Sequence, residues 1–284
     1  MNASAATWVW VDGRLSIAEE AWVSALDHGV TVGDGVFETC KVVDGTPFAL
    51  GRHLRRLRRS AGIIGLSVPG DDAELREITA KAIAAAADDG TVVGRLRITL
   101  TGGPGPLGSG RDEVLATLVV AAGPGDAWAP ATDVVTVDWT RNERSAIAGA
   151  KTTSYAENVV ALARAHEHGA TEAVLANTAG VLCEGTGTNV FLVADGRLCT
   201  PSLATGCLAG ITRELVLEAV EVDERDDLTL DDLRSAPEAF LTSSTRDVQP
   251  IAHVDGVALG AAPGPLTRAA LDGFRATETT SLDP

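Results

Sequence analysis

The sequence predicts a mixed α/β protein organised in two parts, and three observations support this. Strand-like stretches of alternating apolar residues are interspersed with stretches of helical periodicity. The chain of 284 residues exceeds the usual size of one compact domain, and 45% hydrophobic content is ample for a buried core. A stretch rich in glycine and proline, residues 123–130, is the best linker candidate. We therefore expect an N-terminal domain of residues 1–122, a linker of residues 123–131 and a C-terminal domain of residues 132–284.

The first part contains signals for strands and for two consecutive helices. Asp44-Gly45 is typical of a hairpin turn. Leu54, Leu57 and Ile64 share one face of the first predicted helix, and acidic residues open the second, where they suit the helix dipole. The expected strands are residues 8–13, 36–43, 95–101 and 114–121, and the expected helices are residues 52–64 and 72–87.

The second part alternates strands with helices. Ser154 and Glu157 have the spacing of a capping box, in which Ser154 accepts at the helix start and Glu157 reaches back, and Gly169 suits the end of that helix. The expected strands are residues 134–137, 172–175, 181–183, 189–193, 198–200 and 239–242, and the expected helices cover residues 154–168 and 266–274 or begin at residues 212 and 228.

Charge and hydropathy exclude several classes of partner. The net charge of −16 argues against nucleic acid, whose phosphates require a basic surface, and against anionic membranes. The chain has no run of about 18 apolar residues and no amino terminus resembling a secretion signal. We therefore expect a cytoplasmic protein without nucleic-acid or membrane partners.

Cysteine and histidine spacing predicts no metal site. His166 and His168 are two residues apart on a predicted helix and so face different directions. No cysteine pair has the spacing of a zinc site or a disulfide framework, and buried free thiols are the favoured interpretation. The four cysteines are Cys40, Cys183, Cys199 and Cys207.

Lysine is scarce in this chain, which draws attention to Lys151. Among 23 basic residues only Lys41, Lys81 and Lys151 are lysine. Lys151 follows residues 145–150, which are uncharged and, except for Ile147, small. No acidic residue is near it in sequence. A desolvated lysine suits Schiff-base chemistry, which arginine cannot perform. A lysine whose stem lies along apolar surface at a domain junction is the alternative interpretation of this stretch.

Two stretches of the second part could bind a ligand, and the second of them suits an anion. Glu184 precedes small residues that let backbone and hydroxyl groups approach a ligand, although a solvated glycine-rich hairpin explains the same pattern. A loop of residues 206–210 leads into a helix whose first amides, at Ile211 and Thr212, could bind an anion together with the Thr212 hydroxyl. An ordinary threonine N-cap is the alternative there.

Two further stretches suit phosphate. Residues 242–245 are four consecutive hydroxyl residues at a strand end, where a solvated turn is the competing interpretation. Residues 52–59 form a basic helix that is mostly a solvated face, but one inward-facing arginine could supply positive charge to a phosphate.

In their combination and order these motifs closely resemble those of the fold-type IV pyridoxal-phosphate enzymes. That group comprises branched-chain aminotransferases, D-amino-acid aminotransferases and aminodeoxychorismate lyases. The resemblance covers nearly the whole chain and implies an N-terminal α/β sandwich, a C-terminal pseudo-barrel domain, pyridoxal 5′-phosphate as cofactor and a homodimer. The matching stretches are residues 33–39, 53–57, 151–155, 184–191, 210–213 and 242–245.

The resemblance also implies roles for individual residues. Lys151 would form the Schiff base and move a proton between the substrate Cα and C4′ of the cofactor. Glu184 would pair with the pyridine nitrogen, and Arg56 would bind the phosphate. The further cofactor contacts that it implies are Tyr155, Thr188, Asn189, Gly210, Ile211, Thr212, Ser243 and Ser244.

Substrate contacts follow the family patterns less closely. D-Amino-acid aminotransferases usually have tyrosine where this chain has Val30, and an Arg-x-His pair in the loop that here, at residues 102–112, contains only Arg111. Branched-chain enzymes often carry Tyr-x-Arg where this chain has Arg95-Leu-Arg97. Arg97 would bind a substrate carboxylate if its strand face looks into the cleft and would be a surface residue otherwise. The candidate substrate contacts are Val30, Phe37, Arg97 and Arg111.

The resemblance favours a transaminase that moves an amino group between an amino acid or amine and a 2-oxo acid. The residues after Lys151 differ from the pattern often seen in the lyases of the group. The alternative is an aminodeoxychorismate lyase, which converts 4-amino-4-deoxychorismate to 4-aminobenzoate and pyruvate. A cofactor-binding protein without turnover is a third interpretation, against which the retention of Lys151, Glu184 and Arg56 argues.

Overall fold

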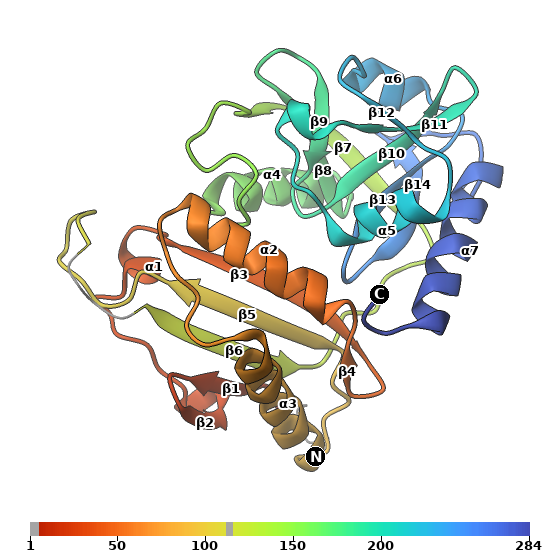
Figure 1. Ribbon diagram of the computed structural model, residues 1–284. Helices are drawn as coiled ribbons and strands as arrows, with labels where there is room; N and C mark the ends of the chain where they lie inside the picture. The colour runs from red at the N-terminus through yellow and green to blue at the C-terminus, as the bar shows by residue number, and fades with distance from the viewer. Residues whose placement is uncertain (1–5, 112–115) are drawn as a thin grey trace. The chain divides into compact units, whose positions relative to one another are not determined.

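The computed structural model describes residues 6–111 and 116–284, which form two compact units, each with its own hydrophobic core (Figure 1). Unit 1 comprises Met1–Ala127, Ala150–Tyr155 and Ser281–Pro284, and unit 2 comprises Trp128–Gly149 and Ala156–Thr280. Asp112 and the first two residues of the strand expected at 114–121 lie outside the described residues. No helix in the described part of the chain is long and apolar enough to cross a membrane.

Unit 1 is built on a six-stranded sheet in the order β2-β1-β6-β5-β3-β4, in which every neighbouring pair is antiparallel. Its strands are β1 Trp8–Val11, β2 Arg14–Ile17, β3 Gly35–Val43, β4 Thr46–Pro47, β5 Arg95–Thr101 and β6 Thr117–Gly123. Its helices are η1 Ala18–Glu20, α1 His28–Thr31, α2 Leu50–Ile63 and α3 Asp72–Asp88.

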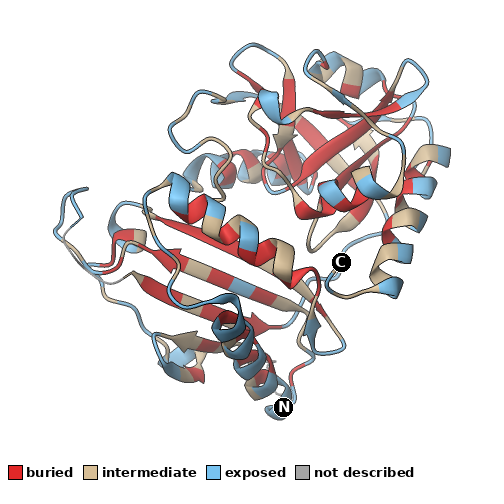
Figure 2. Ribbon diagram, in the orientation of Figure 1, coloured by how far each residue is buried: buried red, intermediate tan, exposed pale blue. Residues whose placement is uncertain are grey.

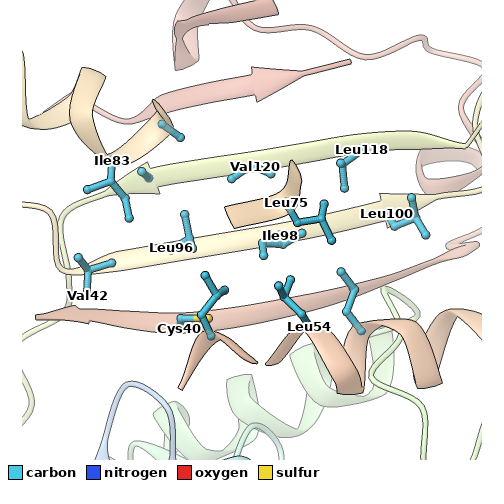
Figure 3. Packing of buried hydrophobic residues seen from close by; sticks show 14 of the residues in the cluster. Cys40, Val42, Leu54, Leu75, Ile83, Leu96, Ile98, Leu100, Leu118 and Val120 are labelled. Atoms are coloured by element: carbon cyan, nitrogen blue, oxygen red, sulfur yellow. The ribbon is translucent and has the colours of Figure 1, made fainter. Parts of the chain in front are cut away.

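The two faces of this sheet have different roles. Residues directly opposite each other in neighbouring strands share a face, so Val36, Leu100 and Leu118 lie on one side. That side is buried against α2 and α3, which contribute residues such as Leu54 and Leu75 to a single core cluster (Figure 3). The opposite face carries the alternate residues of β3 and β5, which include most of the polar side chains of these strands.

Unit 2 contains a nine-stranded mixed sheet in the order β12-β11-β10-β13-β14-β7-β8-β9, with β15 paired to β14. Most residues of its inner strands are buried, whereas its helices are exposed on their outer sides (Figure 2). Its strands are β7 Thr132–Arg141, β8 Glu172–Asn177, β9 Leu182–Gly185, β10 Asn189–Ala194, β11 Arg197–Pro201, β12 Asp223–Arg225, β13 Ala239–Ser243, β14 Asp247–Val254 and β15 Val257–Ala258. Its helices are α4 Ala156–Glu167, η2 Leu203–Thr205, α5 Ile211–Ala219, α6 Leu230–Ser235 and α7 Pro265–Thr280.

The start of α4 differs from the sequence-based expectation. Helix α4 begins at Ala156, two residues after Ser154. The Ser154 hydroxyl donates to the Gly33 carbonyl oxygen at 2.9 Å, so it supports the chain segment around Lys151 and not the helix start.

The four cysteines are buried free thiols, which confirms the interpretation of their spacing.

Candidate functional site

Lys151 lies in a short extended segment beside the edge of β3. The Phe37 backbone N–H donates to the Lys151 carbonyl oxygen at 3.0 Å, and Val36 and Thr152 form an antiparallel bridge. The Lys151 backbone N–H donates to the Ser60 hydroxyl of α2 at 3.1 Å. Backbone contacts therefore fix the position of Lys151 within unit 1.

The Lys151 ammonium group lies among neutral side chains. Its Nζ is 3.4 Å from the Tyr155 hydroxyl and 4.5 Å from the centroid of the Phe37 ring. The Phe37 and Tyr155 rings meet edge to face, with centroids 5.2 Å apart. No carboxylate of the described residues forms an ion pair with Lys151, whereas Lys81 pairs with Glu77 at 2.7 Å. Lys151 is thus an amine without a fixed counterion.

Arg97 contacts the same aromatic ring as Lys151. Phe37 lies opposite Thr99 in the sheet, and Arg97 shares their face. The Arg97 Cζ is 3.8 Å from the Phe37 centroid, so Arg97 and Lys151 lie at most about 8.3 Å apart, the sum of the two ring distances. Arg97 Nε donates to the Thr99 hydroxyl at 3.3 Å, and within residues 6–111 and 116–284 no carboxylate pairs with it. Arg97 is exposed, and partial desolvation of its guanidinium lowers its pKa.

Arg56 belongs to a buried charged cluster on the other face of the sheet. Its Nε and Nη2 donate to the two carboxylate oxygens of Glu38 at 2.8 and 2.7 Å. The His53 Nδ1 donates to the same carboxylate at 2.6 Å. Burial alone would raise the pKa of Glu38, but the Arg56 charge and the hydrogen bonds from Arg56 and His53 lower it to about 2. Glu38 is therefore a carboxylate that fixes the guanidinium of Arg56.

Val30 and Arg111 make their contacts elsewhere in unit 1. Val30 lies in α1 and is 61% exposed. Arg111 Nε donates to Asp34 at 2.7 Å, and its Nη2 donates to the second oxygen of the same carboxylate. His28 Nε2 lies 3.0 Å from the Pro106 carbonyl oxygen. These contacts hold the loop after β5 against α1 and the residues that follow it.

In unit 2, Glu184 accepts a backbone hydrogen bond and forms an ion pair with an arginine. The Leu208 backbone N–H donates to its Oε2 at 2.8 Å. Arg141 Nε lies 3.1 Å from its Oε1, and the side chains of Arg141 and Glu184 are only 20% and 12% exposed. Glu184 is on β9 and Arg141 ends β7, with β8 between them in the sheet. Strand order therefore brings together two residues that are distant in sequence.

Asn189 links Glu184 to the start of α5. Its side-chain amide donates to the Leu208 carbonyl oxygen at 2.9 Å. Gly210, the residue that precedes α5, packs so closely on Asn189 that an added Cβ would overlap the amide oxygen. No side chain caps this helix start, so the first amides, including those of Ile211 and Thr212, are suited to an anion.

Hydroxyl residues of unit 2 lie beside Asn189 in the chain or the sheet, or at the end of β13. Thr242 is opposite Asn189 in the β10–β13 pair, Ser243 ends β13 and Ser244 begins the turn to β14. The buried hydroxyl oxygens of Thr188 and Thr242 have no hydrogen-bond partner. A buried polar group without a partner costs free energy, so these hydroxyls suit a bound polar ligand or water.

Structure thus groups the expected site residues in two sets. The set in unit 1 comprises Phe37 and the three side chains around its ring, Lys151, Tyr155 and Arg97. Arg56 lies in a separate cluster. The set in unit 2 comprises Glu184, Thr188, Asn189, Gly210, Ile211, Thr212, Ser243 and Ser244. Sequence reasoning missed Glu38 and Arg141, although Glu38 lies within the 33–39 stretch and could have been singled out as a carboxylate inside an apolar strand.

The chain is similar in sequence to known aminotransferases. The family model described as amino-transferase class IV matches residues 35–254. The D-alanine aminotransferase of Bacillus licheniformis is 32% identical over 270 residues, which cover 92% of this chain and 93% of that protein. The branched-chain-amino-acid aminotransferase of Pseudomonas aeruginosa is 32% identical over 279 residues, which cover 91% and 89%.

Solved structures share the fold. The crystal structure of a branched-chain aminotransferase from Thermoproteus uzoniensis with norvaline superimposes with a TM-score of 0.85 at 31% sequence identity, covering 95% of this chain and 94% of that one. The agreement confirms the mixed α/β fold expected from the resemblance to fold-type IV enzymes.

Proposed function

This chain belongs to the amino-transferase class IV family, and on that premise we propose which of its residues perform the transamination. It is an aminotransferase whose cofactor is pyridoxal 5′-phosphate.

The residues present fit this cofactor. Lys151 offers an amine without a carboxylate partner among the described residues, as a bond to the cofactor's aldehyde carbon requires. The uncapped start of α5 and the buried hydroxyls of Thr188 and Thr242 offer donors to phosphate and ring substituents. Glu184 offers an oriented carboxylate to the pyridine nitrogen.

We assign the proton transfer to Lys151. When bound, pyridoxal phosphate supplies an electron-withdrawing ring that stabilises negative charge at the substrate Cα. Lys151 would hold the cofactor through its side-chain amine, and the same Nζ, once free, would carry a proton between the substrate Cα and C4′ of the cofactor. The Tyr155 hydroxyl, 3.4 Å from Nζ, and the Phe37 ring orient the amine during this transfer.

The phosphate and the ring of the cofactor are held by further residues of the two sets. Arg56 binds the phosphate from within its pair with Glu38, which fixes the plane of the guanidinium. Glu184 keeps the proton on the pyridine nitrogen. The phosphate is further held by Gly210, Ile211, Thr212, Ser243 and Ser244, and the ring is contacted by Thr188 and Asn189.

Arg97 is the proposed carboxylate-binding residue for the amino acid and the 2-oxo acid. It is the arginine that shares the Phe37 ring with Lys151, and no carboxylate of the described residues occupies it. The Arg97 Cζ and the Lys151 Nζ are at most about 8.3 Å apart, close enough for one substrate to place its amine near Lys151 and a carboxylate near Arg97. Val30 and Arg111 remain candidate contacts, the latter after release from Asp34.

A spectroscopic titration tests the transamination. Purified protein with pyridoxal phosphate should have an absorption band in the visible region that bleaches with an amino acid and returns with a 2-oxo acid. Separate D- and L-amino acids reveal the handedness of the substrate. A band that persists with every amino acid would contradict the proposal and favour the lyase or a protein without turnover. No band at all would show that Lys151 has only a structural role.

We also propose that two copies of the chain form a homodimer. Unit 1 exposes large apolar side chains within one short stretch, which is unusual for a surface facing water. Trp22 is 71% exposed, and Val23, Leu26, Val30 and Val32 are also exposed. Light scattering during gel filtration should give twice the mass of 29.2 kDa, and a monomeric mass would contradict this.

A cytoplasmic location is proposed on the chemistry of the cysteines. All four are buried and free, as is usual in a reducing compartment. Fractionation of cells with an antibody to the protein tests this, and recovery in an extracellular fraction would contradict it.

A further inference from the structure

Glu184 has a cationic neighbour that the preceding assignments do not use. Arg141 Nε lies 3.1 Å from Glu184 Oε1 in a largely buried setting. The Nε has no hydrogen-bond acceptor, so the contact is an ion pair and not a well-aligned hydrogen bond. The other oxygen of Glu184 accepts from the Leu208 backbone N–H. Both oxygens of one carboxylate are therefore engaged by donors or positive charge.

Arg141 is itself fixed by its surroundings. Its Nη1 donates to the Asn158 side-chain oxygen of α4 at 3.0 Å. Asn158 is buried and donates in turn to the carbonyl oxygen of Thr186, two residues after Glu184. Exposed Glu157 is 4.0 Å from Arg141. The arginine is thus tied by α4 to the same chain segment as the carboxylate that it faces.

A fixed cation next to a carboxylate stabilises the ionised form. In a partly buried site an opposite charge within about 4–6 Å changes the balance between the two protonation states by roughly 10- to 1000-fold. A carboxylate that shares a proton with a pyridine nitrogen can hold that proton itself or leave it on the nitrogen. Positive charge beside the carboxylate favours the second state, because the carboxylate then keeps its negative charge.

We propose that Arg141 is a positioning residue that keeps Glu184 ionised and oriented, and thereby keeps the proton on the pyridine nitrogen of the cofactor. This inference rests on the proposed role of Glu184. Arg141 touches neither substrate nor reacting atoms in this account. Its effect on catalysis passes through Glu184 alone, and this gives the inference a specific test.

The test is a double-mutant cycle on cofactor affinity. Apoenzymes of the wild type, Arg141→Met, Glu184→Gln and the double variant are titrated with pyridoxal phosphate, and the dissociation constant is read from the visible absorption. Arg141→Met should weaken binding by about 10-fold or more in the wild-type background and by less than about twofold in the Glu184→Gln background. Equal effects in both backgrounds, or no effect in either, would overturn the inference.

A second readout follows the proton directly. With the cofactor labelled with ¹⁵N, the nitrogen resonance of the wild type should correspond to the protonated ring, and that of Arg141→Met should move toward the neutral ring at the same pH. Arg141→Lys, which keeps the charge, should restore much of the wild-type position. An unchanged resonance in Arg141→Met would contradict the role of Arg141. If Arg141→Met does not fold, Arg141→Gln replaces it in both experiments.

Two controls separate the inference from the proposed function. Arg144→Met removes an arginine three residues away that is 88% exposed, and should leave cofactor affinity and the nitrogen resonance unchanged. A wild type that binds no pyridoxal phosphate would overturn the proposed function and this inference with it. A wild type that binds the cofactor and transaminates but gives an additive cycle would overturn only the role of Arg141.

Discussion

Lys151 and Glu184 differ in whether an oppositely charged side chain lies next to them. Lys151 Nζ contacts a phenol and an aromatic ring, and no carboxylate of the described chain pairs with it. Glu184 is contacted by the guanidinium of Arg141 at 3.1 Å and by a backbone N–H at 2.8 Å. Among the described residues, Lys151 thus has no carboxylate as counterion, whereas Glu184 has Arg141.

This difference in surroundings agrees with the chemical roles proposed for the two residues. A counterion would stabilise the ammonium form of a lysine, whereas a nucleophile and base must lose its proton. A carboxylate that pairs with a protonated ring must instead keep its negative charge. The fold therefore supplies a neutral setting where a proton has to move and a charged setting where it has to stay.

Removal of the Lys151 amine should have the largest effect. Lys151→Ala should abolish the covalent link to the cofactor and lower the transamination rate by about 10⁴-fold, because nucleophile and base are lost together. Steady-state kinetics of the purified variant with saturating cofactor measure this. Lys81→Ala removes an exposed lysine paired with Glu77 and should retain activity. Comparable loss in both variants would contradict the assignment.

A third charged site, Glu38, extends the comparison to a buried pair. Glu38→Gln leaves Arg56 buried without its charged partner and should lower the free energy of unfolding by about 3–5 kcal/mol. Urea denaturation at neutral pH measures the change. Glu77→Gln, which disrupts an exposed pair, should cost less than about 1 kcal/mol. Equal costs would show that the Glu38 cluster contributes little.

The same variant gives a pH dependence with a defined sign. The pKa of Glu38 is lowered from 4.5 to about 2 in the folded protein by Arg56 and His53, despite burial. Its contribution to stability is then complete above pH 4.5 and disappears as the pH falls through about 2. The stability difference between wild type and Glu38→Gln should therefore shrink between these values. A difference that stays constant over this range would contradict the lowered pKa.

Gly210→Ala tests the unit that carries Glu184. The new Cβ would overlap the Asn189 side chain and displace it from Leu208, so cofactor affinity should fall by about 100-fold. Gly187→Ala is the matched control, because a Cβ there meets nothing within 4 Å and Gly187 lies in the same motif as Glu184. Titration of both apoenzymes with pyridoxal phosphate measures the effect. Unaltered affinity of Gly210→Ala would argue against a cofactor contact at the start of α5.

Arg97→Gln should have the smallest of these effects and a selective one. The Michaelis constant for amino acids and 2-oxo acids should rise by about 10-fold, because a charged contact to the carboxylate is lost. Amines without a carboxylate should be unaffected. Arg95→Gln is the control, since Arg95 shares the strand face but pairs with Asp126. An equal rise for amines with and without a carboxylate would exclude Arg97 as the carboxylate-binding residue.

Local sequence patterns were sufficient where one element or one residue type carried the signal. The strand Arg95–Thr101 has the bounds that its alternation predicts. Lys151 was identified from the scarcity of lysine and the small residues before it. By contrast, β14 was not among the expected strands. It contains Pro250, which is unusual in an inner strand, yet β14 lies between β13 and β7.

Contacts that depend on strand order could not be predicted from sequence. Arg141 and Glu184 meet because β7, β8 and β9 are neighbours, and a pattern of one strand contains no information on its neighbours. Arg111 was expected as a substrate contact, and its pairing with Asp34 depends on the loop after β5 lying against α1. Its role with substrate stays a prediction.

The most direct test of the account is to map the lysine that binds the cofactor. Holoenzyme is reduced with borohydride and digested, and the peptide that carries the added phosphopyridoxyl mass is identified. Because the chain has only three lysines, the assignment is unambiguous. The account predicts the label on Lys151 alone. A label on Lys41 or Lys81, or an unlabelled Lys151 in protein that has bound the cofactor, would contradict it.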